Sequence, residues 1–127
     1  MRQILLFAKA PDLGRVKTRM APLLDEEQCC QLHVDLLRAT LNNCQQVSGV
    51  ETVLWVSATH DLFKTRPYSL FNLGVQQGND LGQKMSFACQ QALRDCEAIL
   101  LLGADCPLVS ANLIEQAFEA VAQGHDM

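Results

Sequence analysis

Residues 9–22, KAPDLGRVKTRMAP, are the stretch that decides how this chain folds. Pro11, Gly14 and Pro22 prevent regular structure through its middle, because proline and glycine interrupt helices and strands. The apolar residues 4–8 (ILLFA) come directly before it. We therefore predict an irregular loop at the carboxyl end of a buried strand.

This loop is strongly cationic. It contains four of the ten lysine and arginine residues of the chain, namely Lys9, Arg15, Lys17 and Arg19. Open α/β sheets bind ligands at the carboxyl ends of their strands, and clustered cations favour a polyphosphate. The alternative is a solvated loop with scattered cations, although surface loops usually mix the two charge signs more evenly.

The composition is that of one ordinary globular domain. Its 127 residues can bury a core, and 49% of them are hydrophobic and 19% charged. The net charge of −4 argues against general nucleic-acid binding, because the basic residues gather in one loop. No apolar run reaches the roughly 18 residues that a membrane helix needs, and the N-terminal run is too short for a signal peptide. We expect a cytoplasmic protein that binds neither nucleic acid nor membrane.

Apolar spacing predicts strands that alternate with helices. Continuous apolar or β-branched runs predict strands at residues 3–8, 51–57, 70–76 and 98–102. Helical spacing predicts helices at residues 26–46, after Asp80 and after Ser110. This order implies an α/β fold of three layers, a mostly parallel sheet with helices on both faces. Residues 98–102 (AILLL) form the most hydrophobic strand, which we expect to be central.

The same spacing predicts which helical side chains face inward. Asp25 begins a capping box on the first helix, and His33 is expected on the solvent side of that helix. The apolar stripe of the second helix includes Leu81 and Leu93, and that of the third includes Leu113.

Tryptophan, histidine and cysteine often take part in catalysis or binding, but here we expect them to have structural roles. Trp55 is expected in the core, with base stacking as the alternative, and His60 in a solvated loop, with catalysis as the alternative. The six cysteines include no C-x-x-C pair, and most fall in helical patterns, where cysteine is usually a small buried hydrophobe. We expect no disulfide framework.

Asp105 is the other candidate for chemistry, because it comes directly after the strand at 98–102. In a doubly wound sheet this strand end can lie beside the cationic loop, across the topological switch point. A carboxylate there could hold Mg²⁺ or Mn²⁺ that bridges the phosphates of a nucleotide. The alternative is an aspartate that caps a turn before Pro107.

Three blocks of the sequence, in the same order, resemble a known family. The blocks are residues 7–19 (FAKAPDLGRVKTR), 78–85 (GNDLGQKM) and 102–107 (LGADCP). They resemble the nucleotide-diphospho-sugar transferase-like proteins of GT-A fold, some of which are described as glycosyltransferases associated with radical-SAM selenodomain proteins. That group is similar to the molybdenum-cofactor and phospholactate guanylyltransferases. The resemblance spans nearly the whole chain.

The resemblance implies a role for each matching residue. The signature loop that holds nucleotide phosphates corresponds to Lys9, Gly14, Arg15, Lys17 and Arg19. The turn near the base or ribose corresponds to Gly78, Asp80 and Gly82, and the metal-binding aspartate corresponds to Asp105. The resemblance thus names Arg15, Lys17 and Asp105 as catalytic candidates and Asp105 as the ligand of Mg²⁺ or Mn²⁺.

The chain departs from the resembled family in two ways. Many relatives have threonine where Ala104 stands. Relatives also continue into a further strand and an Asp-Gly-Gly-Tyr block, so residues 1–127 are expected to be the N-terminal part of a longer GT-A domain, truncated at the C-terminal side. In that case the strand at 98–102 becomes a sheet edge, and we expect a homo-oligomer that pairs through it.

These expectations lead to two functional readings. The first is a nucleotidyl- or glycosyl-transferase domain that binds a nucleoside triphosphate or nucleotide-sugar, a divalent metal and an unknown acceptor. The second is a non-catalytic nucleotide-binding or self-associating module that lacks part of the active site. A blander third reading is a structural α/β domain whose loop binds any anion.

Overall fold

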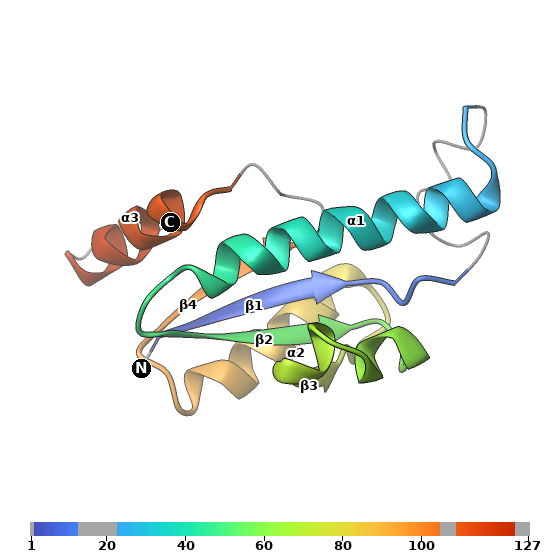
Figure 1. The fold of residues 1–127 in the computed structure, drawn as a ribbon. Helices are drawn as coiled ribbons and strands as arrows, with labels where there is room; N and C mark the ends of the chain where they lie inside the picture. The colour runs from blue at the N-terminus through green and yellow to red at the C-terminus, as the bar shows by residue number, and fades with distance from the viewer. Residues whose placement is uncertain (1, 13–22, 105–108, 124–127) are drawn as a thin grey trace.

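The computed structural model describes residues 2–12, 23–104 and 109–123, and Figure 1 shows its strands and helices. The strands are β1 (Arg2–Ala8), β2 (Val50–Val56), β3 (Asn72–Val75) and β4 (Ala98–Gly103). The helices are α1 (Glu26–Gln45), α2 (Leu81–Leu93) and α3 (Ala111–Ala122), with short 3-10 helices η2 (Asp61–Lys64) and η3 (Tyr68–Leu70) between β2 and β3.

The sheet is four-stranded, with the order β3-β2-β1-β4 and every pairing parallel. In β1, Ile4, Leu5 and Leu6 are each 0% exposed, because this strand has a neighbour on both sides and helices above and below. The chain proceeds from β1 outward to β3 and then returns to place β4 on the other side of β1. This topology confirms the predicted α/β fold and puts the switch point between β1 and β4.

Helices cover both faces of the sheet. Figure 1 shows α1 and α3 over one face and α2 over the other. Beneath α1, Leu37 and Leu41 pack on Leu6 and Leu54 of the central strands. The opposite face of the sheet packs against Ala88 and Ala92 of α2. There the ring of Trp55 lies over Gly74, where an added Cβ would come within 2.7 Å of it, and Phe87 meets the indole edge-on.

Each helix begins at its predicted cap. The side chains of Asp25, Asp80 and Ser110 accept hydrogen bonds from the backbone N–H three residues on, at 2.7, 2.8 and 3.2 Å. These bonds satisfy donors that the first turn of a helix otherwise leaves unpaired. Among the described residues no helix is both long enough and apolar enough to span a membrane.

Two expectations about position were wrong. His33 is only 7% exposed, not on the solvent side of α1, because its ring contacts the backbone after β1. The strand β4 is not central, as its hydrophobicity suggested, but lies at one edge of the sheet formed by the described residues, the position expected for it in a truncated domain. Its hydrophobicity comes from packing by α2 on one face and α3 on the other rather than from strand neighbours on both sides.

Three leucines expected in apolar stripes are exposed instead. Leu81, Leu93 and Leu113 are 63%, 54% and 51% exposed. The first two stand at the ends of α2, beyond the part that covers the sheet, while Ala88 and Ala92 in its middle are buried. In α3 the predicted Phe118 is buried, but the other buried residue is Ile114, one position after the predicted Leu113.

Single residues behaved as their structural readings predicted. Trp55 is buried, as are Cys29, Cys44 and Cys96. The described cysteines are all free thiols. Burial raises the pKa of Cys44 to about 11, as expected for a thiol packed among apolar side chains.

Candidate functional site at the carboxyl edge of the sheet

The carboxyl ends of β1 and β4 lie side by side. Phe7 pairs with Gly103 at the end of the ladder, and the N–H of Ala104 donates to the carbonyl of Phe7 at 3.0 Å. Lys9, which is exposed, follows β1 by one residue. The two strands that precede the candidate residues Lys9 and Asp105 are therefore neighbours across the switch point, as the predicted fold requires.

Side chains from β2 and β3 hold the backbone that follows β1. Ser57, directly after β2, accepts a hydrogen bond on Oγ from the N–H of Ala10 at 2.8 Å, and its own N–H donates to the carbonyl of Ala8 at 3.0 Å. Gln76, directly after β3, donates from Nε2 to the carbonyls of Ala8 and Trp55 at 3.3 and 2.9 Å. The sheet is thus extended past its last paired residues by side-chain hydrogen bonds.

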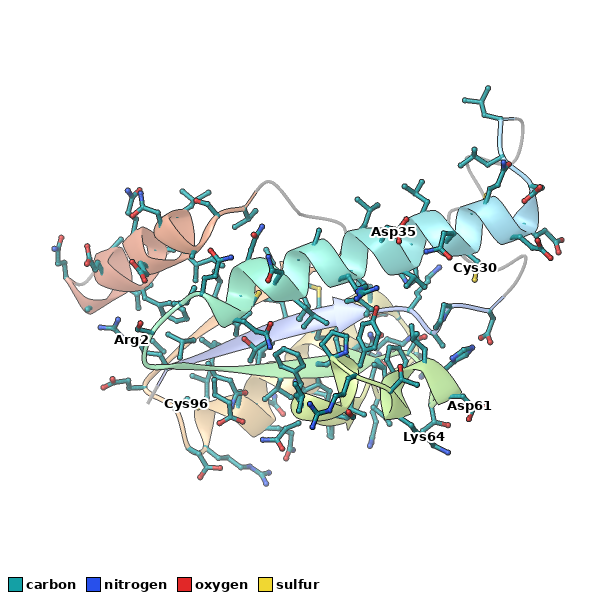
Figure 2. All side chains as sticks on the ribbon, viewed as in Figure 1. Arg2, Cys30, Asp35, Asp61, Lys64 and Cys96 are labelled. Carbon is teal, nitrogen blue, oxygen red and sulfur yellow. The ribbon has the colours of Figure 1, made fainter. Side chains whose placement is uncertain are left out.

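Helix α1 holds the same segment from the other side. The Nε2 of His33 lies 2.7 Å from the carbonyl of Lys9, so that nitrogen carries the proton and donates it. The thiol of Cys30 donates to the carbonyl of Pro11, with Sγ 2.9 Å from the oxygen. Figure 2 shows Cys30 on the side of α1 that faces this segment.

The environment of Cys30 keeps its thiol protonated. Burial raises its pKa, and the negative charges of Asp12 and of an ionised Cys29 raise it further. A protonated thiol can donate to Pro11, whereas a thiolate would repel the carbonyl. Cys30 is therefore a packing and hydrogen-bonding residue rather than a nucleophile.

Asp12 and His60 face each other across the ends of β1 and β2. The Nδ1 of His60 accepts a hydrogen bond from the N–H of Leu62 at 3.0 Å and so caps η2. The proton of the neutral ring is therefore on Nε2, which lies 3.8 Å from Oδ1 of Asp12. Because the lone pair of Nδ1 accepts from Leu62 and Nε2 carries the proton, His60 has no free lone pair for general-base catalysis, which agrees with its structural reading.

The turn after β3 is built by glycine and a helix cap. Gly78 has φ +140, and a Cβ there would come within 2.7 Å of the Gln83 Cβ and 2.9 Å of the Lys84 nitrogen. Only glycine fits this position. At Gly82, by contrast, the nearest described atom to an added Cβ is Oδ1 of Asp80, at an ordinary contact distance of 3.4 Å. The fold of the described residues therefore gives no steric reason for Gly82 to lack a side chain.

A buried hydroxyl holds the end of β4. Thr40 of α1 is 0% exposed, and its Oγ1 lies 2.9 Å from the carbonyl of Ala104 and 2.8 Å from that of Leu36. The backbone is thereby fixed up to the residue before Asp105. Five of the candidate residues lie outside the described part of the chain: Gly14, Arg15, Lys17, Arg19 and Asp105.

The predicted metal ligand, Asp105, lies outside the described residues. The described residues contain no group of three or more His, Cys, Asp or Glu side chains that could hold a metal ion. Mg²⁺ is commonly bound by one or two carboxylates together with substrate phosphates. A single carboxylate after β4 would therefore be enough protein ligand for it. Asp105 would be that ligand.

Sequence reasoning did not identify the residues that hold the site together. Ser57 and Gln76 carry one readable signal, since each is the first polar residue after a strand and therefore stands at the carboxyl edge. His33 and Thr40 carry no such signal, because their hydrogen-bond partners are 24 and 64 residues away in the sequence.

Comparison with solved structures supports the fold. A candidate nucleotide-diphospho-sugar transferase from Desulfovibrio desulfuricans G20 matches 95% of this chain with a TM-score of 0.86 and 24% sequence identity. The present chain spans 54% of the length of that protein. Among curated proteins none matches.

A sequence family also matches. Residues 40–127, more than half of the chain, match the family described as uncharacterized proteins conserved in bacteria. The matched part includes β2 to α3 and hence the Gly78 turn and the residues after β4. This protein accordingly belongs to that bacterial family, DUF2064.

Proposed function

We propose that this chain is a nucleotidyl- or glycosyl-transferase domain that binds a nucleoside triphosphate or nucleotide-sugar together with Mg²⁺ or Mn²⁺. The observation that carries the proposal is the adjacency of the β1 and β4 carboxyl ends, with the exposed Lys9 after the one and Ala104, the residue before Asp105, after the other. The solved structure of similar fold, described as a candidate nucleotide-diphospho-sugar transferase, supports the same class.

The proposed roles of the candidate residues follow from the charge of their side chains. Lys9, Arg15, Lys17 and Arg19 neutralise the phosphates, and the arginines can hold two phosphate oxygens at once. When bound, the metal supplies charge neutralisation for the departing phosphate group, with Asp105 as its protein ligand. The contribution of the chain itself is mainly to position the phosphates and stabilise their charge, with Arg15 and Lys17 nearest to the chemistry.

The turn after β3 supplies the proposed contact to the base or ribose. Gly78 and Asp80 shape the start of α2, where the side chain of Asp80 caps the helix. Gly82 is the informative residue, because outside its own helix a Cβ there would meet only Oδ1 of Asp80 among the described residues, at 3.4 Å. Glycine at a position that tolerates a side chain supports close approach of a ligand to the backbone.

A thermal-shift screen tests the proposal. It covers the common nucleoside triphosphates and nucleotide-sugars, each with and without Mg²⁺ or Mn²⁺, with sulfate as the anion control. A ligand that binds only the folded state raises its stability by roughly 2.7 kcal/mol at a hundred times its dissociation constant. We expect a metal-dependent shift for one nucleotide class, which Asp105→Ala abolishes and Gly82→Ala weakens.

Matched charge variants sharpen the screen. Lys9→Gln removes a cation at the carboxyl edge, whereas Arg94→Gln removes an exposed cation at the far end of α2. Only the first should weaken nucleotide binding. Equal losses, or a shift no larger than that with sulfate, would favour the domain whose loop binds any anion.

The edge position of β4 supports a second candidate function, a nucleotide-binding module that self-associates. In the described sheet this strand has a neighbour only on the β1 side, and Ile99 and Leu101 are half-buried. Such an apolar edge can pair with the same strand of a second copy. Sedimentation analysis should then show a concentration-dependent dimer that binds nucleotide without turnover, and a monomer at all concentrations would exclude this candidate.

A further inference from the structure

The backbone of residues 9–11 lies beyond the last paired residues of β1 and β2, which are Ala8 and Val56. Backbone groups past the end of a ladder lose their strand partners and must find others. Here side chains directly after β2 and β3, and from α1, contact the carbonyls of Ala8, Lys9 and Pro11 and the N–H of Ala10.

Gln76 bridges two strands with one amide. Its Nε2 has two hydrogens, and the carbonyls of Ala8 on β1 and Trp55 on β2 lie within 3.3 and 2.9 Å of it. Its backbone N–H meanwhile donates to Val56 at 2.8 Å, continuing the β3 pairing. The side chain is therefore held at its base while its amide ties the ends of β1 and β2 together.

Ser57 completes this arrangement one residue further along. Its N–H donates to Ala8 and its Oγ accepts from Ala10, so one residue contacts the backbone on both sides of Lys9. The carbonyl of Lys9 itself is taken by His33. These contacts fix the backbone at Lys9 and leave the Lys9 side chain exposed.

We infer that Ser57 and Gln76 are positioning residues for phosphate binding, because they fix the backbone that carries Lys9. This inference rests on the proposed function. A cation on a fixed backbone binds with less loss of conformational entropy than one on a mobile segment. Removing either residue should therefore weaken phosphate affinity while the nucleotide contacts themselves are left unchanged.

The test compares two variants with a matched control. Ser57→Ala removes the acceptor for Ala10, and Gln76→Met keeps the length of the side chain but removes both of its donors. The control is Asn72→Ala, which breaks an exposed cross-strand bond of 2.9 Å to Glu51 at the opposite end of β3. Calorimetric affinity is measured for ATP, CTP, GTP and UTP, each with Mg²⁺, and for inorganic tripolyphosphate.

We expect about a five-fold loss of affinity in Ser57→Ala and in Gln76→Met, the size of one ordinary hydrogen bond, and no loss in Asn72→Ala. Ser57→Thr keeps the hydroxyl and should restore the affinity. Hydrogen exchange of the Ala10 amide, measured by NMR without ligand, should become faster in Ser57→Ala. A purely structural role would lower the melting temperature of the variants without changing affinity in the folded state.

The outcomes separate the inference from the proposed function. Binding by the wild type with unchanged affinity in both variants would overturn the inference and leave the proposed function standing. No binding of any of these probes, or of any nucleotide-sugar, by the wild type would overturn the proposed function and the inference with it. If Gln76→Met does not fold, Ser57→Ala and Ser57→Thr decide the result between them.

Discussion

The turn after β3 and the segment after β1 both leave the carboxyl edge of the sheet, but they are held in different ways. In the turn, the side chain of Asp80 accepts from the N–H of Gln83 and the side chain of Gln83 accepts from the N–H of Asn79, all within a few residues of sequence. In the segment, the partners of the backbone are 24, 47 and 68 residues away. The first can form as soon as α2 forms, whereas the second requires the sheet and α1 to be assembled.

This contrast has consequences for how each region responds to mutation. A locally built turn depends on single backbone conformations, which one substitution can destroy. A segment held by several distant side chains loses only one of its contacts at a time. Substitutions in the turn and in the strand ends therefore test the contrast directly.

Gly78→Ala is expected to have the largest effect, a loss of about 3 kcal/mol in the free energy of unfolding. The added Cβ would lie 2.7 Å from that of Gln83 and the backbone would keep a φ of +140. Urea denaturation followed by circular dichroism measures the loss. Gly82→Ala is the control, and its stability should change by less than about 1 kcal/mol because its Cβ has room. Equal losses in the two variants would contradict the steric account.

Thr40→Val should cost about 2 kcal/mol, because it removes the one hydroxyl hydrogen that the carbonyls of Ala104 and Leu36 share in a fully buried site. Valine matches threonine in shape, so packing changes little. Thr40→Ser keeps the hydroxyl and should recover most of the stability. The same denaturation measurement checks this, and a neutral Thr40→Val would show that the distant contact at the end of β4 is dispensable.

Asp80→Ala should cost about 1 kcal/mol through loss of the cap on α2. Asp80→Asn keeps an oxygen acceptor at the same place and should be close to wild type in stability. Comparison of the two by thermal denaturation separates the cap from the negative charge. If Asp80→Asn were as unstable as Asp80→Ala, the charge rather than the hydrogen bond would be what the turn needs.

Cys30→Ala should have the smallest effect, about 0.5 kcal/mol, because Pro11 is one of several anchors on the segment after β1. Cys30→Ser retains a donor and serves as the control. Because the pKa of Cys30 is raised, its thiol should also react slowly with iodoacetamide near neutral pH, as peptide mapping by mass spectrometry would show. Rapid alkylation would contradict a protonated, hydrogen-bonded thiol.

Much of the fold could be predicted because its signals are local. The apolar run in β1, the caps Asp25, Asp80 and Ser110, and the alternation of strands with helices are all readable within short windows. The parallel three-layer arrangement follows from that alternation, since each crossover needs a helix on one face. The errors at Leu81 and Leu93 arose because helical spacing gives the stripe but not where the helix extends beyond the sheet, and Leu113 was wrong by one residue, since Ile114 is the buried position.

The candidate site could be predicted only in outline. The glycine and cap of the turn after β3 were identified from sequence, and the structure gives Gly78 a steric reason and Asp80 a hydrogen-bonding one. His33 was wrongly expected in solvent, because a histidine at that helical position looks polar until its partner on Lys9 is known. The roles of Arg15, Lys17, Arg19 and Asp105 stay predictions, since these residues lie outside the described part of the chain.

The sequence by itself determined which segments are strands and helices, where the helices begin, and that the cationic residues follow the first strand. These properties depend on backbone preference and on neighbours a few residues away. Only the tertiary structure decided between a central and an edge position for β4, and showed that His33, Ser57, Gln76 and Thr40 hold the strand ends. The physical reason is that these contacts join residues far apart in the chain, which meet only after the sheet has closed around β1.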